Sequence, residues 1–147
     1  MLMKMTFYED FARAFLIEAK NDFDRANKAF NENDFPYAVF NSQQCVEKAV
    51  KAMIEAKREY VYNQGPRLAS IFIRVFGDEW IDDYDEIVNI IGWFSEYYTK
   101  ARYPFMFKGK VVTPSEYINR EIAEESIRKA EKVLKIAENY LRKKRII

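Results

Sequence analysis

Histidine is absent from this chain of 147 residues. Histidine is the side chain that most often acts as a general base near neutral pH, and it is also the commonest metal ligand. Its absence excludes nucleophilic catalysis of the Ser-His and Cys-His kinds, in which an imidazole activates the nucleophile. Lysine or tyrosine can replace histidine as a general base only with a strongly shifted pKa, which nothing in the sequence predicts.

Cysteine is nearly absent as well, because Cys45 is the single one. One cysteine excludes an intrachain disulfide and a zinc site built from cysteines. Alanine and valine surround Cys45 in its predicted helix, so we expect a small buried side chain and not a nucleophile. The sequence also lacks a glycine-rich phosphate loop and a G-x-S-x-G elbow.

Acidic residues form clusters such as Asp82, Asp83, Asp85 and Glu86. The helix dipole alone favours carboxylates in a first helical turn, so this cluster is expected at the start of a helix without any metal. We therefore predict no metal site and no cofactor.

Long apolar runs are missing too. No run approaches the roughly 18 apolar residues that a membrane span requires, and Glu9, Asp10 and Arg13 interrupt the apolar residues near the start, unlike in a signal peptide. We expect a cytoplasmic protein without membrane contact. The 24 basic and 23 acidic residues nearly balance, so no overall field favours nucleic acid. A basic tail, residues 142–147, suits the C-terminal end of a helix.

The predicted fold class is all-α. Only four glycines and four prolines are present, and the apolar residues recur every three or four positions, as on one face of a helix. We predict a compact up-and-down helical bundle of four long helices plus one short helix, forming a single domain over residues 1–147. At this length a domain buries enough surface to be stable without disulfides.

Local signals place the helix ends. Thr6 with Glu9 forms a capping box that opens the first helix. Asp34, as N-cap before Pro36, opens a second and central helix that runs to about residue 57. Gly65-Pro66 then breaks the chain before a short helix over about 67–76, which Gly77 stops.

The rest of the chain is predicted in the same way. A fourth helix covers about 81–100, and an irregular or extended segment follows over 101–113. Thr113 and Glu116 form a second capping box that opens the last helix. No alternation of apolar and polar residues is long enough to build a sheet.

The central helix carries an unusual polar set, Gln43, Gln44, Glu47 and Lys48, among apolar residues. Gln43 falls within an apolar stripe, and a buried amide needs hydrogen-bond partners. Those partners would come from a neighbouring helix, from a second copy in a dimer, or from a ligand. We assign Gln43, Gln44 and Glu47 a structural or interface role.

The second candidate site lies where the fourth helix ends. Arg102 offers a planar fork that suits phosphate or carboxylate, while Tyr98 and Tyr103 offer rings on which a base can stack. We assign these three residues to ligand or phosphate binding, with Lys48 as a second charge. The alternative is structural: Arg102 pairs with a carboxylate or with terminal carbonyls, and Tyr103 covers the core.

Several segments in order make the chain similar to the HEPN family, in the prokaryotic branch of these small helical bundles. They are Ala19–Phe23 with Ala26, Asn33–Ala38, Gln43–Ala52, Ala101–Pro104, and Pro114–Tyr117 leading to Ala123 and Ala130. The resemblance covers about residues 12–140.

The resemblance implies a homodimeric bundle. Many HEPN proteins bind a minimal nucleotidyltransferase as a toxin–antitoxin pair, and many others are metal-independent ribonucleases with an Arg-x(4–6)-His motif. No histidine follows Arg102 here, and none stands in Gln64–Leu68, where this branch often has one. The resemblance therefore implies a non-catalytic module that binds a nucleotide, nucleic acid or protein.

Two alternatives stay open at this point. One is a ribonuclease with a degenerate active site, in which Arg102 is the catalytic cation. The other is a purely structural or dimerisation module. The 12 phenylalanines and 10 tyrosines favour a homodimer in every case, because exposed aromatic patches commonly mark interfaces.

Overall fold

The computed structural model describes residues 2–59 and 67–147, with side chains from residue 7 onward. The described part is mostly helical, which confirms the predicted fold class. Its elements are α1 (Leu2–Asn31), α2 (Phe35–Ala56), α3 (Leu68–Phe76), η2 (Gly77–Glu79), α4 (Asp82–Ser95), β1 (Phe105–Phe107), β2 (Lys110–Val112), α5 (Pro114–Tyr117) and α6 (Arg120–Lys143).

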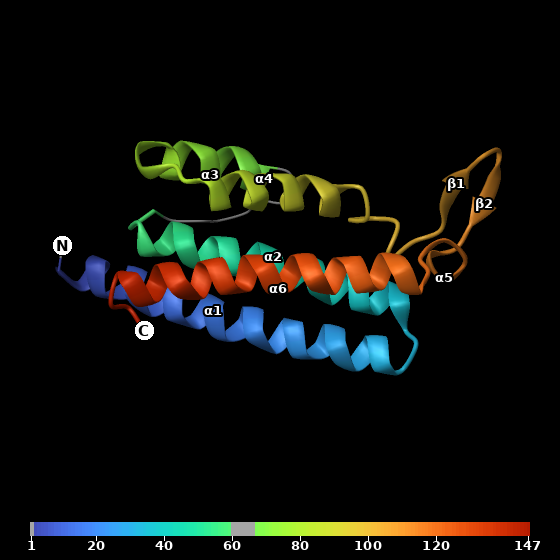
Figure 1. Ribbon diagram of the computed structural model, residues 1–147, viewed down its shortest axis with the longest axis horizontal. Helices are drawn as coiled ribbons and strands as arrows, with labels where there is room; N and C mark the ends of the chain where they lie inside the picture. The colour runs from blue at the N-terminus through green and yellow to red at the C-terminus, as the bar shows by residue number, and fades with distance from the viewer. Residues whose placement is uncertain (1, 60–66) are drawn as a thin grey trace.

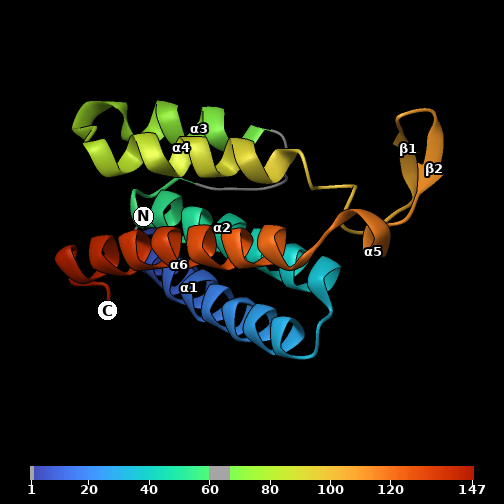
Figure 2. The same cartoon turned by 45° about the vertical axis from the view of Figure 1, so that its right-hand side comes forward.

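The helices form two layers. The long helices α1, α2 and α6 run side by side, and α3 and α4 lie across one side of them (Figures 1 and 2). Helix α2 contacts α1, α3, α4 and α6, which confirms its predicted central position. The hairpin β1–β2 and the short α5 project together from the end opposite to the two chain termini (Figure 1).

Small residues allow the three long helices to approach closely. The fully buried alanines are Ala12, Ala19 and Ala26 on α1, Ala38, Ala49 and Ala52 on α2, and Ala123, Ala130 and Ala137 on α6. Each set recurs at helical spacing, so one face of each helix is packed against its neighbours. Larger side chains, among them Phe72, Phe76 and Met53, fill the space between the two layers.

The two ends of α1 differ in how well the sequence predicts them. The helix begins at Leu2, so the prediction that Thr6 caps its start was wrong. Leucine, methionine and lysine precede Thr6 and favour helix, which lets the helix extend past the capping signal. At the other end, Asn33 takes a positive φ of 63° in the turn to α2.

Asp34 caps α2 as predicted. Its Oδ1 accepts the backbone N–H of Tyr37 at 3.3 Å, and Pro36 stands in the first turn. Such a side chain satisfies one of the N–H groups that a helix start leaves without a partner.

The middle of the chain departs from prediction at the end of α4. The predicted break at Gly65-Pro66 lies outside the described residues. Helix α3 ends at Phe76 with Gly77 as its C-cap, as predicted, and the short η2 turn follows. Helix α4 ends at Ser95, five residues before the predicted end. Residues 96–102 form turns.

The prediction that the chain builds no sheet was wrong at the hairpin. Strands β1 and β2 pair antiparallel, with Met106 opposite Val111. Their two-residue turn has positive φ at Lys108 (51°) and Gly109 (80°), which is the twist that a short hairpin requires. Strands of three residues are too short to show alternation in the sequence.

Two caps shape the C-terminal part. The capping box of Thr113 and Glu116 forms as predicted, but it opens the four-residue α5. The long α6 has its own N-cap, Asn119, whose Oδ1 accepts the N–H of Ile122 at 2.9 Å. The predicted last helix is therefore two helices.

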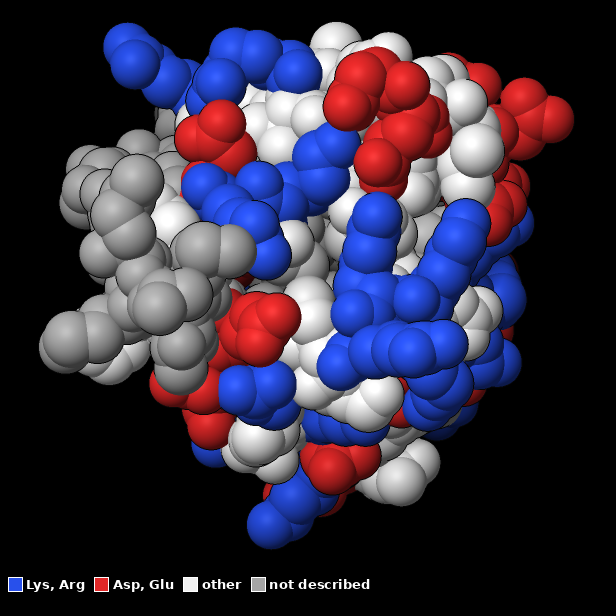
Figure 3. Space-filling view, turned by 90° about the vertical axis from the view of Figure 1, so that its left-hand side faces the viewer, with Lys and Arg blue, Asp and Glu red and all other residues white. Residues whose placement is uncertain are grey.

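The basic tail folds back onto the bundle. Arg145 has a positive φ of 60°, and the N–H of Ile146 donates to Leu141 O at 2.9 Å. Ile146 is buried, and Arg13 Nη1 donates to its carbonyl at 3.0 Å. Figure 3 views this end of the molecule, where Lys and Arg side chains gather beside a group of Asp and Glu. Within residues 2–59 and 67–147, no helix has the length and apolar content for a membrane crossing.

Candidate functional site

Arg102 lies in the turns after α4, and aromatic rings surround its guanidinium. The Cζ atom is 4.4 Å from the ring centre of Tyr98, 5.2 Å from that of Tyr103 and 5.7 Å from that of Phe40 on α2. Each contact is a cation–π interaction, which orients the planar guanidinium against the rings. Packing therefore holds a cation at the surface between α2 and the end of α4.

The charge of Arg102 is not neutralised by a neighbour. Arg102 Nε donates to the Tyr98 carbonyl at 3.0 Å, and among the described residues no carboxylate oxygen comes within 4 Å of the guanidinium. The two terminal nitrogens remain available to a ligand. The structural alternative is met only in part. Arg102 contacts a carbonyl, as that alternative expects, but Tyr103 is 56% exposed and does not cover the core.

Lys48 does not share this site. Its Nζ lies 2.5 Å from Asp22 Oδ2 on α1, and the buried Asp22 also pairs with Arg25 at 2.7 Å. Lys48 therefore ties α2 to α1, while Phe40 on α2 contacts Arg102. The structure brings Tyr98, Arg102 and Tyr103 together and leaves Lys48 apart from them.

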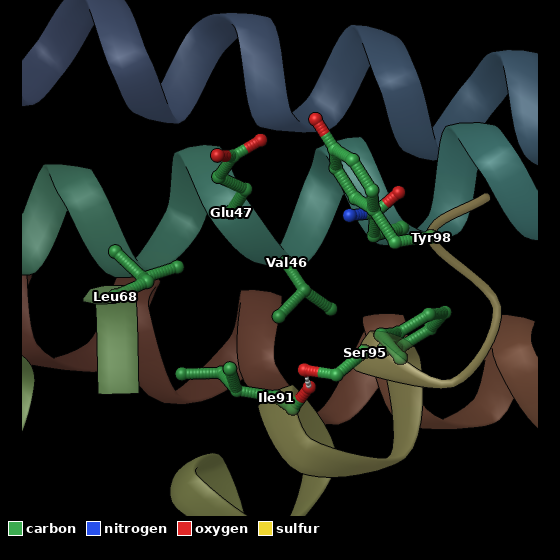
Figure 4. Close-up of a pocket in the computed structure, with 8 residues that line it drawn as sticks. Val46, Glu47, Leu68, Ile91, Ser95 and Tyr98 are labelled. Atoms are coloured by element: carbon green, nitrogen blue, oxygen red, sulfur yellow. Dashed lines mark hydrogen bonds between the residues drawn. The ribbon is translucent and has the colours of Figure 1, made fainter. Parts of the chain in front are cut away.

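A pocket of about 180 Å³ opens between α2, α3 and α4 (Figure 4). It is lined by Gln43, Val46, Glu47, Leu68, Ile91, Phe94, Ser95 and Tyr98. In Figure 4, Glu47 and Tyr98 lie along one rim and Ile91 and Ser95 along the other, with Val46 between them. Two of the three residues assigned a structural role, Gln43 and Glu47, thus line a pocket, while Gln44 is half-buried and does not.

A second hollow, about 350 Å³ and more open, lies beside Arg102. Its walls are Asp34, Pro36, Tyr37, Phe40, Ala101 and Arg102. The Asp34 carboxylate in its wall is already engaged as the cap of α2. Tyr98 belongs to the first pocket and stacks on Arg102, so the two hollows lie on either side of the Tyr98–Arg102 contact.

The hairpin covers the positions where the resemblance to HEPN ribonucleases would place a histidine. With four to six residues between it and Arg102, that histidine would fall at residues 107–109. Phe107 packs edge-on against Tyr117, with ring centres 5.1 Å apart, and Lys108 and Gly109 form the turn. Apart from Lys108, these positions carry no group that can move a proton.

Cys45 is not part of either hollow. It is fully buried in α2. Burial, with a smaller effect from the Asp22 carboxylate, raises the pKa of the Cys45 thiol to about 12. The thiol is therefore neutral near pH 7 and a poor nucleophile. Within the part of the chain that the structure describes, no three Cys, Asp or Glu residues gather where they could hold a metal ion.

Sequence reasoning missed Phe40 and the apolar walls of the pocket. Phe40 stands one turn before Gln44 on α2, so it shares a face with the polar residues of that helix. That position could have indicated that Phe40 belongs to the site. Val46, Leu68, Ile91 and Phe94 offered no such signal, because apolar residues at helical spacing look the same in a wall and in a core.

Comparisons with known proteins agree with this fold. The family model described as the HEPN domain matches residues 12–140. A protein of Methanocaldococcus jannaschii named "Putative toxin MJ1304" is 31% identical over 138 residues, which cover 91% of this chain and 90% of that protein.

Two solved structures have the same fold. TT1696 from Thermus thermophilus matches with a TM-score of 0.70 at 24% identity, over 88% of this chain and 98% of that one. ST0689, described as an archaeal HEPN homologue, matches with a TM-score of 0.66 at 23% identity, over 87% and 95% of the two chains.

Proposed function

This chain belongs to the HEPN domain family, and we propose that it is a non-catalytic member that binds the phosphate of a nucleotide or of RNA at Arg102. The proposal rests on the surroundings of the Arg102 guanidinium. Its guanidinium is held by aromatic rings, is exposed, and has no carboxylate partner among the described residues.

The chemistry of the site suits a nucleotide. A guanidinium presents two parallel N–H groups to a phosphate, and such charge-assisted pairs are stronger than neutral hydrogen bonds. Tyr98 and Tyr103 are 42% and 56% exposed, so a base can stack on them. Stacking on an aromatic side chain contributes about 1–3 kcal/mol per base. With a net charge of +1, binding depends on this local geometry more than on a general field.

The proposal assigns binding and not cleavage. General acid–base catalysis typically accelerates a reaction by about 10²–10⁴-fold, and the segment after Arg102 has a half-buried phenylalanine where the family's ribonucleases have histidine. A cation alone stabilises the phosphate but does not remove the proton of the 2′-hydroxyl.

The family and the archaeal relative support a second part of the proposal. A relative named as a putative toxin favours a toxin–antitoxin role, in which this chain acts as a homodimer and pairs with a minimal nucleotidyltransferase. The exposed apolar side chains beside Arg102, namely Tyr37 and Tyr103, and Met106 on the hairpin offer surface for such contacts. Co-purification with the product of a neighbouring nucleotidyltransferase gene would support this pairing, and its absence when both are co-expressed would contradict it.

Fluorescence polarisation of a labelled ten-nucleotide RNA tests the binding site. We expect Arg102→Ala to weaken binding at least tenfold, because one charge-assisted phosphate contact and its stacking support are lost. Arg128→Ala is the matched control, since Arg128 is an exposed arginine on α6 that is paired with Glu125. Equal binding by the wild type and Arg102→Ala, or no binding by either, contradicts the proposal. RNA cleavage that disappears in Arg102→Ala would instead favour the ribonuclease alternative.

A further inference from the structure

The pocket between α2, α3 and α4 has an apolar floor. Val46, Leu68 and Phe94 are each no more than 3% exposed, and Ile91 is half-buried. Its volume is about 180 Å³, and an apolar cavity of about 150 Å³ accommodates benzene. The pocket therefore has room for one flat ring system, while a sugar and a phosphate would remain outside its mouth.

The rim of the pocket carries two polar groups, Gln43 and Glu47, that form no side-chain hydrogen bond within the described part of the chain. Gln43 and Glu47 are one turn apart on α2, so their side chains share a face. Glu47 Oε1 lies 3.6 Å from Lys51 Nζ, which is too long for a hydrogen bond. Among the described residues, no donor is bonded to the Glu47 carboxylate and no group is bonded to the Gln43 amide.

The Glu47 carboxylate keeps room for further hydrogen bonds. Its side chain is only 19% exposed, and its one charged neighbour, Lys51, lies 3.6 Å away as an ion pair. Two carboxylate oxygens accept two N–H groups side by side, and an amide beside them can donate one more. The rim is therefore complementary to a ring edge with two adjacent donors followed by an acceptor.

We propose that this pocket binds a guanine base, and this rests on the proposed binding of phosphate at Arg102. The edge of guanine presents the N2 amino group, the N1–H and the O6 oxygen in sequence. Glu47 accepts from the two nitrogens, and the Gln43 amide donates to O6. Adenine, cytosine and uracil do not present two adjacent donors on this edge, so each places an acceptor or a C–H against the carboxylate.

Tyr98 links the pocket to Arg102. Its ring lines the pocket and lies 4.4 Å from the Arg102 guanidinium carbon. A base in the pocket and a phosphate on Arg102 are thus neighbours, as they are in one nucleotide or in adjacent nucleotides of RNA. The same guanine chemistry comes from a free nucleotide or from RNA.

Calorimetric titration with GMP, IMP and AMP tests the inference. We expect the wild type to bind GMP about tenfold more tightly than AMP, which is within the discrimination that a bidentate base contact provides. IMP lacks the N2 amino group and should bind more weakly than GMP. Glu47→Gln should reduce GMP binding to the level of AMP while AMP binding stays within twofold.

Glu131→Gln is the matched control, because Glu131 forms an ion pair of the same spacing with Lys135 on α6, at 3.9 Å. It should keep the preference for GMP. If Glu47→Gln does not fold, the titrations of the wild type still test the assignment of the pocket to guanine. Equal affinities of the wild type for GMP and IMP overturn that assignment. Five-nucleotide RNAs with a central G or A distinguish the source: a preference for G in these as well indicates RNA, and a preference in mononucleotides alone indicates a free nucleotide.

The outcomes separate this inference from the proposed function. Equal binding of GMP and AMP that Arg102→Ala abolishes overturns the guanine pocket and leaves phosphate binding at Arg102 in place. No binding of any nucleotide or RNA by the wild type overturns both.

Discussion

At the scale of single residues, Arg102 and Arg120 are instructive to compare. Both guanidinium groups lie on aromatic rings, since Arg120 Cζ is 4.9 Å from the Phe30 ring and 5.3 Å from the Phe35 ring. Arg120 Nη2 also donates to Asn33 Oδ1 at 3.1 Å, so it fastens the start of α6 to the turn between α1 and α2. Arg102 donates its one side-chain hydrogen bond to the nearby Tyr98 carbonyl, so no hydrogen bond from its guanidinium joins it to another element in the described part of the chain. Arg120 therefore joins elements of the fold, whereas the Arg102 guanidinium is left for a ligand.

This contrast predicts different effects of two similar substitutions on RNA binding. Arg120→Ala should lower the free energy of unfolding by about 1 kcal/mol, because it removes a hydrogen bond and cation–π contacts, and should leave RNA binding within twofold. Arg102→Ala removes contacts of the same kind and should lower the free energy of unfolding by no more than about 1 kcal/mol, but it should weaken RNA binding at least tenfold. Urea denaturation and polarisation measure the two effects. A large loss of stability in Arg102→Ala would mean that Arg102 is structural.

Cys45 gives a pH-dependent prediction. Burial raises the pKa of its thiol to about 12, so the reactive thiolate is scarce below that pH, at roughly one molecule in 10⁴ near pH 8. We expect a thiol reagent to label the native protein very slowly at pH 8, and the rate to increase as the pH rises. Denaturant should make labelling fast at pH 8. Rapid labelling of the native protein would contradict the burial of this residue.

At the scale of elements, local signals were sufficient for some boundaries and not for others. Asp34 and Pro36 fixed the start of α2 to within one residue, because an N-cap acts on the next three residues. The end of α4 and the hairpin were not predictable in this way. The hairpin is stabilised by its turn and by packing of Phe105 and Phe107 on Tyr117, at 5.0 and 5.1 Å, and Tyr117 belongs to a different element.

The candidate site likewise has residues that the sequence predicts and residues that only the packing of the helices brings in. Tyr98, Arg102 and Tyr103 were predicted together because they lie within six residues of one another. The contact with Phe40 and the pocket depend on how α2 packs against α4, which a single sequence does not reveal. Lys48 was expected to add charge to this site, but the packing of α1 on α2 pairs it with Asp22.

The cap of α2 can be tested by itself. Asp34→Ala should lower the free energy of unfolding by about 1 kcal/mol, since the N–H of Tyr37 loses its acceptor. Asp24→Ala is a suitable control, because Asp24 is exposed within α1 and makes no hydrogen bond or ion pair in the described part of the chain. Urea denaturation compares the two variants. Equal stabilities would show that Asp34 does not act as a cap.

At the scale of the whole molecule, several exposed apolar side chains belong to the segments around Arg102 and the hairpin. Tyr37, Tyr98, Tyr103, Met106 and Val111 are between 42% and 66% exposed. Exposed apolar surface, where it is contiguous, commonly marks a protein interface. A dimer that used these segments would place two copies of the site near each other.

Light scattering tests the expected dimer. The chain has a mass of 17.6 kDa, so a homodimer should give about 35 kDa at micromolar concentration, because burial of these aromatic side chains favours association. Dilution should shift the mass toward that of a monomer. A mass near 17.6 kDa at all concentrations would contradict the prediction.

The location of the ligand is the central claim, and an NMR titration of isotope-labelled protein with a short RNA tests it most directly. We predict that the largest amide shifts fall within residues 34–47 and 94–103, around Arg102 and the pocket, and that the basic tail at residues 142–147 changes little. Shifts centred on the basic tail, with those around Arg102 unchanged, would contradict the account.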